Sequence, residues 1–354
     1  MKISYSYRLL NRDGTDLGPL HGVARGTGQT TYAADAPIKS SGSITLHDTG
    51  QIEDWLNTRI QPWVNVDGDE WPLGVFIPDV PGRDLNDMGE TVTVNLLDKL
   101  TNIAGDAYGY TYGLTANTDI LATVRDIIES TGETATGLED TDLVALLRTD
   151  AEWDPNATKL DIINDLLSAA NLFDLWVDGR GRFRVTQWMR PSRRPVVAQF
   201  IDGENGVSLE NVYAPNFNVT NDYGRTPNVY IAISQGDDVR PGLRAEIANM
   251  NPDDPFSLLR RGVRKLPAFG VETGVKTTSQ AALDEYAARR LIEESQPQET
   301  ITIAHPPKRL QNNDVVRFRS RKHGLDGLFT VNQMRWQHAF NGLVETTLRK
   351  VVDL

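Results

Sequence analysis

The sequence contains no cysteine, which excludes disulfides and thiolate metal sites. No apolar run approaches the roughly 18 residues that a membrane-spanning helix needs, and the N-terminal stretch lacks the hydrophobic segment of a signal peptide. Histidine is scarce as well, and no two of the five histidines have the spacing of a metal-binding helix or finger. We therefore predict no membrane span, no metal site and no cofactor.

Positive charge is also in short supply. The 36 lysines and arginines are outnumbered by 48 acidic residues, so the formal net charge is −12. This balance argues against sequence-independent DNA binding, which needs a basic surface. An acidic wall would instead repel phosphate and keep passing DNA mobile. A length of 354 residues suits two or three domains.

The motifs of nucleotide, metal and hydrolase sites are incomplete. Gly26-Thr27-Gly28 lacks the Gly-Lys-Ser/Thr ending of a phosphate-binding loop. Oxygen ligands for calcium could come from Asn65, Asp67, Asp69 and Glu70, but the Asp-Gly at their centre is already explained as a turn between two strands. The Gly-x-Ser-x-Gly elbow of serine hydrolases does not occur. No catalytic residue is predicted.

Carboxylates gather in one stretch of the sequence, formed by Glu139, Asp140, Asp142, Asp150 and Glu152. A solvated acidic face explains this stretch most simply. The alternative function is a cell-wall-degrading or carbohydrate-binding module that uses these acids, since glycoside hydrolysis needs a pair of carboxyl groups. That alternative predicts a deep cleft with two facing carboxylates.

The clearest structural signal lies between Asn156 and Trp188. Thr158 can cap the first turn of a helix, and Asp161 stands where the acid of a capping box would stand. Asn171 can end the helix, because Asn tolerates the left-handed conformation. We expect a helix of about four turns between these signals. Its apolar residues recur at helical spacing: Leu160, Ile162, Ile163, Leu166, Leu167 and Ala170.

A β-hairpin is predicted directly after this helix, because the period changes from 3.6 to 2. The turn is Asp178-Gly179-Arg180-Gly181, whose glycines permit positive φ. The unit contains no nucleophile and no histidine, so we predict that it is scaffold. The residues expected to face the core are Phe173, Leu175, Val177, Phe183 and Val185. Those expected to face outward are Asp174, Asp178, Arg182, Arg184 and Thr186.

The same patterns divide the chain. Short strands with turn signals fill residues 1–98, which predicts a first small antiparallel barrel. Residues 99–200 predict a mixed α/β domain. Strand patterns return in 201–354 and predict a second barrel, interrupted by residues 236–297, which are a candidate completion of the mixed domain. The predicted fold class is mainly β with an α/β part: two small tube-like antiparallel β-barrels plus a mixed α/β domain.

Individual elements follow from the same periods. Helices are predicted at 118–130, 141–148 and 279–294. The strongest later strand is 227–234, which we assign to the second barrel, and weaker strands are predicted at 207–212 and 216–220. The last two strands are predicted to be joined by Asn341-Gly342, a strong signal for a short hairpin.

Two basic clusters interrupt the acidic background. The first is Arg180, Arg182, Arg184, Arg190, Arg193 and Arg194, and the second is Arg317, Arg319, Arg321 and Lys322. Each is either a solvated face or a contact with an acidic neighbouring subunit, for which arginine is well suited. Nucleic-acid binding is disfavoured because no aromatics interleave with these residues. The candidate interface residues are Arg182, Arg184, Arg317, Arg319 and Arg321.

In this order of elements the chain resembles the tail hub proteins of tailed bacteriophages, especially minor tail proteins of long-tailed phages of actinobacteria. Three stretches carry the resemblance. They are SSGSITLHDTGQIEDWLNTRIQPWVNVDGDEWPLGVFIP with its Trp-rich hairpin, LLSAANLFDLWVDGRGRFRV, and LQNNDVVRF followed by DGLFTVNQMRW and a final strand. These are patterns of size and order over most of the chain, and none is a catalytic motif.

The resemblance implies a specific assembly. Hub proteins contribute two tube-like barrels each, so a homotrimer presents six barrels and joins the sixfold tail tube to the threefold tail tip. Here the barrels would be residues 1–98, and 201–235 joined with 298–354. The mixed domain would combine 99–200 with 236–297. Some relatives carry a peptidoglycan-cleaving domain after the hub, which we do not expect here because the sequence stops at Leu354.

The resemblance also implies partners and a location. A distal tail or tail tube protein would lie above the hub and tail-tip or fibre proteins below it. The tape-measure protein would lie in the channel, and DNA would only pass through. The protein would sit at the distal end of the virion tail after synthesis in the host cytoplasm. No enzyme activity is expected.

Overall fold

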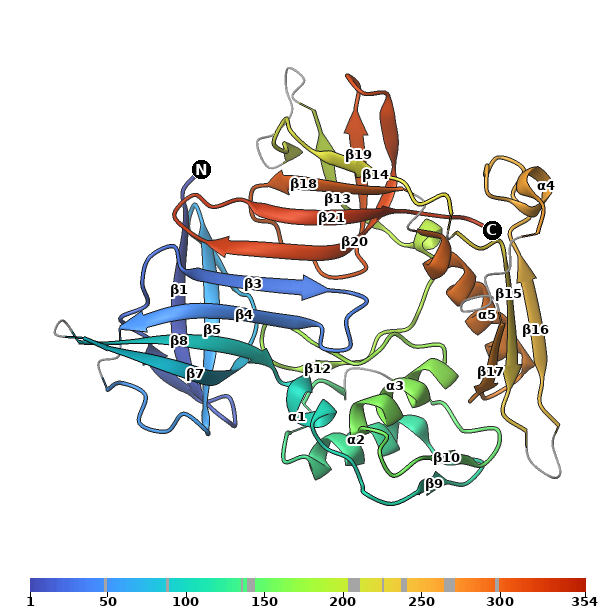
Figure 1. Ribbon diagram of the computed structural model, residues 1–354, viewed down its shortest axis with the longest axis horizontal. Coiled ribbons are helices and arrows are strands. Elements are labelled where there is room, and N and C mark those ends of the chain that lie inside the picture. Colours follow the sequence, from blue (N-terminus) through green and yellow to red (C-terminus); the bar gives the residue numbers. More distant parts are fainter. Residues whose placement is uncertain are drawn as a thin grey trace.

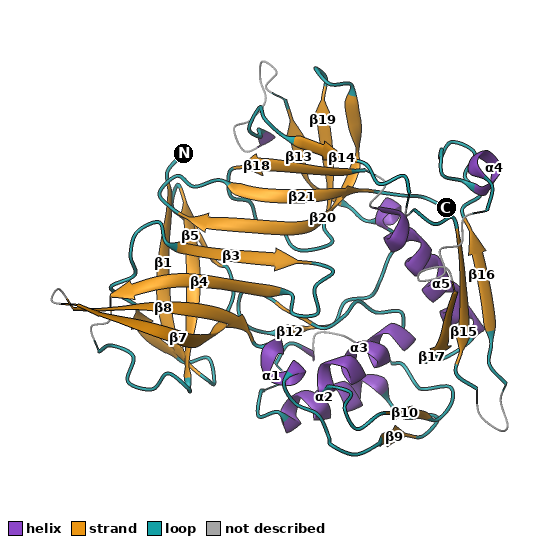
Figure 2. Cartoon of the chain, viewed as in Figure 1, coloured by secondary structure: helices purple, strands orange, loops and turns teal. Residues whose placement is uncertain are grey.

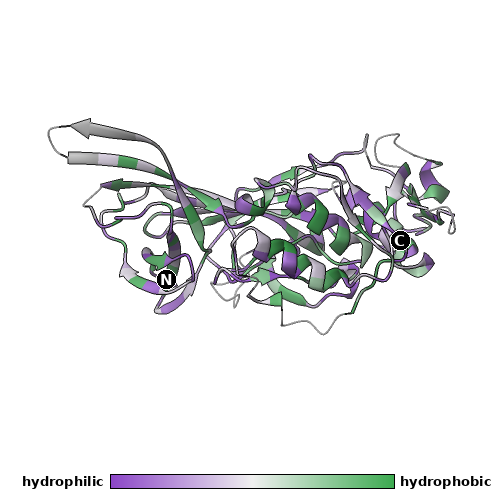
Figure 3. Cartoon of the chain, turned by 90° about the horizontal axis from the view of Figure 1, so that it is seen from below, coloured by the Kyte–Doolittle hydropathy of each residue, from purple (hydrophilic) through white to green (hydrophobic). Residues whose placement is uncertain are grey.

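The computed structural model describes residues 1–47, 50–86, 89–134, 136–138, 144–202, 211–224, 226–236, 241–263, 271–296 and 299–354. The chain is mainly β, with antiparallel sheets and few helices (Figures 1 and 2). The two termini lie toward opposite ends of the long axis of the molecule (Figures 1 and 3). Among the described residues, no helix has the length and apolarity to cross a bilayer.

Fourteen strands form one large sheet. Its N-terminal strands are β1 (Ile3–Asn11), β2 (Asp16–Pro19), β3 (Gly28–Ala33), β4 (Ser40–His47), β5 (Thr58–Val66), β6 (Asp69–Pro72), β7 (Phe76–Asn86) and β8 (Gly89–Asp98). Its C-terminal strands are β13 (Val196–Ile201), β14 (Asn218–Thr220), β18 (Thr300–His305), β19 (Val315–Ser320), β20 (Leu325–His338) and β21 (Val344–Lys350). The strand order is β14-β18-β21-β20-β3-β4-β8-β7-β5-β1-β2, with β13 and β19 beside β20 and β6 beside β5.

The expectation of two separate barrels needs correction, because the described strands form one open path and no closed barrel. The long strand β20 causes this continuity. Its first half pairs with β19 and its second half with β3, so it joins the N-terminal strands to the C-terminal ones (Figure 1). Sequence patterns report only the period of a strand and not its distant partner. For that reason the pairing of β3 with β20 was not predictable.

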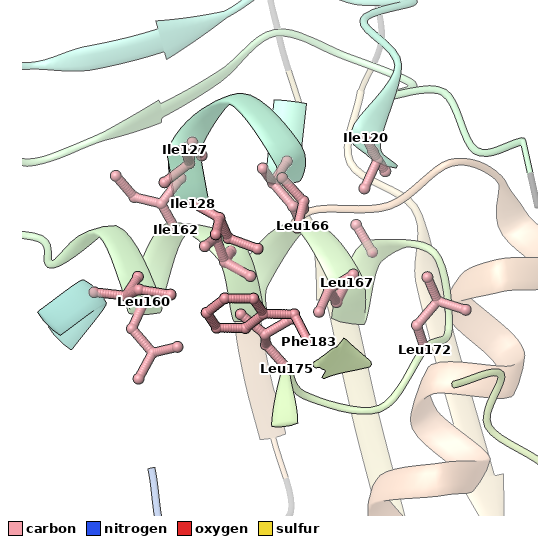
Figure 4. Packing of buried hydrophobic residues seen from close by; sticks show 14 of the residues in the cluster. Ile120, Ile127, Ile128, Leu160, Ile162, Leu166, Leu167, Leu172, Leu175 and Phe183 are labelled. Carbon is pink, nitrogen blue, oxygen red and sulfur yellow. The ribbon is translucent and has the colours of Figure 1, made fainter. Parts of the chain in front are cut away.

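A helical unit lies below the sheet in Figure 1. It contains α1 (Leu100–Ala104), α2 (Ile120–Ser130), α3 (Lys159–Ala169), β9 (Tyr112–Leu114), β10 (Ala151–Trp153), β11 (Trp176–Val177) and β12 (Phe183–Arg184). A short 3-10 helix follows at Pro191–Arg193. The apolar faces of α2 and α3 meet over Phe183 and Leu175 in one buried cluster (Figure 4). Burying such faces supplies most of the stability of short helices.

The predicted start and end of the central helix are confirmed. Thr158 and Asp161 form the reciprocal hydrogen bonds of a capping box, and Asn171 has a positive φ of 55°. The helix α3 has 11 residues, about three turns rather than four. The hairpin after it is also shorter than predicted, with two residues paired on each strand. One prediction is wrong: Asp178 is buried, with 8% of its surface exposed, instead of facing outward.

A third unit contains β15 (Val229–Ser234), β16 (Arg244–Ala248), β17 (Val271–Val275), α4 (Leu258–Arg261) and α5 (Gln280–Ser295). We expected the strand at 227–234 to join the C-terminal sheet. Instead, β15 pairs antiparallel with β16 and parallel with β17, and α5 packs on them. A strand buried on both faces reads as a continuous apolar run, and such a run does not reveal which sheet it enters.

Two further predictions are settled only in part. In the expected helix at 141–148, the described residues 144–148 are not helical. The backbones of Ala145 and Leu147 instead pair with Ile120 and Thr118, at the start of α2. The remainder of that helix, and most of the strand predicted at 207–212, lies outside the described residues.

Candidate functional site

A cleft of about 1020 Å³ lies where the large sheet, the helical unit and α5 meet. One wall comes from the β5–β6 hairpin and the turn between β11 and β12, and a second wall comes from α5. Residues of β3 and β20, the two strands that join the sheet halves, also line the cleft. The cleft is therefore assembled from segments that are far apart in the sequence.

The turn between β11 and β12 is built around the buried carboxylate of Asp178. The backbone N–H groups of Arg180 and Arg182 donate to it at 2.9 and 3.1 Å. The guanidinium groups of Arg182 and Arg184 form ion pairs with it at 3.0 and 3.2 Å. A buried carboxylate needs this many partners, because burial of an unpaired charge is strongly unfavourable. Asp178 therefore organises the turn from inside.

Two glycines let this turn dock closely on the large sheet. A Cβ at Gly179 would lie 2.4 Å from the carbonyl oxygen of Pro72, and a Cβ at Gly181 would lie 2.8 Å from a methyl carbon of Val75. The side chain of Gln61 donates to the carbonyl oxygen of Gly179 at 3.2 Å. The side chain of the turn's remaining residue, Arg180, is exposed at the wall of the cleft.

A buried ion-pair cluster holds the helical unit against the sheet behind this wall. The carboxylate of Glu133 lies 3.5 Å from Arg59 and 3.1 Å from Lys99, and all three side chains are at least nine-tenths buried. Asn102 donates a further hydrogen bond to Glu133 at 2.9 Å. Lys99 also stands over the ring of Phe183, with its nitrogen 4.7 Å from the ring centroid. These contacts fix the position of the wall.

The second wall is anchored by arginines of α5 and by Arg194, which directly follows the short 3-10 helix. Arg289 pairs with Glu293 at 2.8 Å and donates to the carbonyl oxygen of Leu172. Arg194 donates to the carbonyl oxygen of Asn313 at 2.9 Å and stacks on Phe173 at 4.9 Å. Burial lowers the pKa of Arg194 to about 10, which still leaves it charged at neutral pH.

The cleft is both aromatic and basic. Nine of the 36 lysines and arginines line it, but only seven of the 48 acidic residues do. Burial also raises the pKa of Glu294 and Asp314, two of those seven acids. The cleft thus has a positive balance inside an acidic protein. Five of the seven tryptophans line it: Trp63, Trp71, Trp176, Trp188 and Trp336.

The structure separates the candidate interface arginines into two places. Arg182 and Arg184 line the cleft. Arg317 and Arg319 lie on the outward face of β19, and both pair with Asp326 of β20, at 3.0 and 3.7 Å. Arg321 follows β19 and does not line the cleft. The two clusters are therefore not brought together.

The other residues considered from the sequence have structural roles. Asp67, with φ of 52°, forms the β5–β6 turn, and Asp69 pairs with Arg309. Asp150 accepts a hydrogen bond from the backbone of Ala116 at 2.8 Å, and Glu152 is exposed on β10. Glu139, Asp140 and Asp142 lie outside the described residues. Within the part of the chain that the structure describes, no three potential metal ligands cluster.

Sequence patterns missed the residues that α5 and β20 bring to the cleft. Arg289 and Arg290 lie on α5, a helix that was predicted, but its apolar spacing does not tell which unit it packs against. Trp336 lies on a predicted strand, and its position in the cleft depends on the β3–β20 pairing. The one available signal was the density of tryptophan near the β5–β6 hairpin.

No protein-family model and no curated protein matches this sequence. Solved structures do match it over nearly its whole length. A tail protein from Neisseria meningitidis MC58 superposes with a TM-score of 0.65 at 13% identity, covering 98% of this chain and 97% of that one. The 43 kDa tail protein of prophage MuSo2 from Shewanella oneidensis gives 0.63 at 11% identity, covering 97% and 98%.

This chain has the fold of phage tail proteins. The prophage tail protein gp18 from Listeria monocytogenes EGD-e also has this tail-protein fold, with a TM-score of 0.58 at 12% identity over 97% of this chain and 94% of that one. At these identities the likeness establishes the arrangement of the elements, and particular residues cannot be carried across. The cleft of this chain must therefore be interpreted from its own side chains.

Proposed function

We propose that this chain is a structural protein of a phage virion, located at the distal end of the tail. The observation that carries the proposal is the tail-protein fold, which extends over 98% of the chain. A structural role also agrees with the sites described above, because the candidate acids and glycines serve turns and caps. Within the tail, the proposed role is that of a homotrimeric hub, which joins the sixfold tube to the threefold tip and lines the DNA exit channel.

Open sheet edges support an assembly role. Strands β2, β6, β13 and β14 each pair on one side only among the described strands. Exposed edges are sites where another chain can add to a sheet, and closed assemblies cover them. In the proposed trimer, residues 1–98 supply one tube-like part, and β13, β14 and residues 299–354 supply the other. The helical unit and the unit of β15, β16, β17 and α5 would lie outside the channel.

The proposed partners follow from this position. A tail tube or distal tail protein would cover one end of the ring and tail-tip or fibre proteins the other, while the tape-measure protein and DNA pass through. An acidic chain suits such a conduit, because a negative wall does not hold phosphate. We propose Arg317, Arg319 and Arg321 as contacts with an acidic neighbouring subunit, and Arg182 and Arg184 as contacts with a neighbour at the cleft.

The test is the number of copies. Light scattering over a concentration series should give about three times the 39.3 kDa chain mass, and cryo-electron microscopy of the assembled tail should place three copies at its distal end. A particle in which the copy number is not three would refute the hub. Arg319→Glu should weaken the trimer, while Arg125→Glu, on the exposed face of α2, should not.

A further inference from the structure

The cleft contains cationic groups that the described part of the chain leaves without a carboxylate partner. Arg180 is exposed and forms no ion pair with any described residue. Arg194 donates to two carbonyl oxygens, of Met189 and Asn313, and forms no ion pair within 4 Å with a described carboxylate, while Glu293 and Asp314 interact with it from a longer distance. Both residues line the cleft. The positive balance of the cleft is thus available to an anionic group that enters it.

The wall of the cleft also contains unmet hydrogen-bonding capacity. The indole N–H of Trp336, a residue only 2% exposed, has no partner among the described residues. The side-chain oxygen of Asn312 likewise has none. Both atoms are shielded from solvent, and a buried unpaired polar group is unfavourable by about 1–3 kcal/mol. A main-chain carbonyl could accept from the indole N–H, and a main-chain N–H could donate to the Asn312 oxygen.

The dimensions and the aromatic faces select among anionic ligands. A volume of about 1020 Å³ is at the upper end of the range for small-molecule sites, which favours a stretch of polymer. Arg309 lies over Trp71 at 5.0 Å and itself lines the cleft, so that indole face is not free for a sugar ring. A nucleic acid carries a phosphate at every nucleotide, so some of its charges would lie against the seven carboxylates of the lining. A polypeptide with separated acidic side chains can place its carboxylates at the arginines and its neutral residues beside the carboxylates of the lining.

We propose that the cleft binds an extended acidic segment of another polypeptide, with Arg180 and Arg194 receiving its carboxylates. The tryptophans of the lining, such as Trp336 and Trp63, would hold the apolar part and main chain of the segment. This inference depends on the side chains of a single chain and does not depend on the hub stoichiometry. A tail protein with such a cleft could capture the tail of a neighbouring virion protein.

The test uses the full chain and a synthetic octapeptide, acetyl-Glu-Leu-Glu-Gly-Glu-Leu-Glu-Gly-amide, with its Glu-to-Gln counterpart as the neutral probe. Binding is measured by calorimetry and by tryptophan fluorescence at low salt, since five of the seven tryptophans line the cleft. We expect saturable binding of the acidic peptide and at least about tenfold weaker binding of the neutral one. Chitohexaose and a dT oligonucleotide serve as the sugar and nucleic-acid probes.

Matched charge reversals locate the site. Arg180→Glu should weaken peptide binding at least about tenfold, because a like charge replaces the partner of a carboxylate. Arg125→Glu changes the net charge equally but lies on α2 outside the cleft, and should leave binding within about twofold. Equal weakening by the two variants, absence of peptide binding at millimolar concentration, or saturable binding of chitohexaose or dT in its place would each overturn the proposal. A failed trimer test would leave these outcomes unchanged.

Discussion

Protonation of His338 should destabilise the join between the two halves of the sheet. This histidine ends β20, and its Nδ1 and Nε2 atoms lie 2.9 Å from the hydroxyl of Tyr7 and 3.1 Å from that of Thr30. Its ring also stacks on Tyr5 at a centroid distance of 4.8 Å. Burial lowers the pKa of His338 to about 3, from an ordinary value of 6.5. The folded protein therefore holds this ring neutral where the unfolded chain would charge it.

The sign and size of the effect follow from linkage. Between pH 7 and pH 5 the unfolded chain takes up a proton at this position and the folded chain does not, so stability falls as the pH falls. The contribution of His338 to that loss is about 2 kcal/mol. His305, whose pKa burial lowers to about 4, should add a similar amount. The free energy of unfolding of a typical domain is about 5–15 kcal/mol, so a loss of this size is measurable.

The assay is urea unfolding of the wild type and of His338→Gln at pH 7 and pH 5. The substitution should lower stability at both values through lost packing, but the wild type should lose about 2 kcal/mol more than the variant between them. Burial raises the pKa of Asp98, Glu294 and Asp314, which acts in the opposite direction and cancels in the comparison. His305→Gln is the matched second variant. Equal pH dependence in wild type and His338→Gln would refute the reasoning.

Three further substitutions test the contacts that shape the cleft. Glu133→Gln leaves Arg59 and Lys99 buried without a carboxylate and should lower the free energy of unfolding by about 3–5 kcal/mol. The control Asp326→Asn breaks an exposed pair and should change the free energy of unfolding by less than about 1 kcal/mol. Gly179→Ala forces a Cβ against the carbonyl of Pro72 and should lower the free energy of unfolding by about 1–3 kcal/mol. The control Gly82→Ala has open space around the new Cβ and should be tolerated. Similar denaturation midpoints for the two variants would contradict this prediction. Thr158→Ala removes the cap of α3. It should lower the free energy of unfolding by about 1 kcal/mol, which a lower melting temperature would show.

Local features were predictable from the sequence because one short stretch contains everything that determines them. The cap of α3 and its end at Asn171 depend on residues within one or two turns. The outward position of Arg317 and Arg319 follows from simple alternation along β19. The predominance of β structure likewise follows from the many short alternating runs.

Features that depend on partners far away in the sequence were not predictable. The pairing of Trp336 with Thr30 joins residues about three hundred positions apart, and nothing in either strand names the other. Asp178 reads as an outward residue of a hairpin, yet two arginines and the docking of the turn on Pro72 bury it. The cleft was not predictable for the same two reasons, because each of its walls comes from a different region of the sequence.

The contacts around the cleft imply that one of its walls is held more rigidly than the other. The wall that contains Arg180 is held by a buried ion-pair cluster and by two glycines so close to the sheet that a Cβ would clash with it, which leaves little freedom to shift. The α5 wall is held to the helical unit by single arginine contacts, such as that of Arg289 with the carbonyl oxygen of Leu172. A segment entering the cleft would therefore displace the α5 wall first. Arg289→Ala should then change the affinity for an acidic peptide while leaving the Arg180 wall in place.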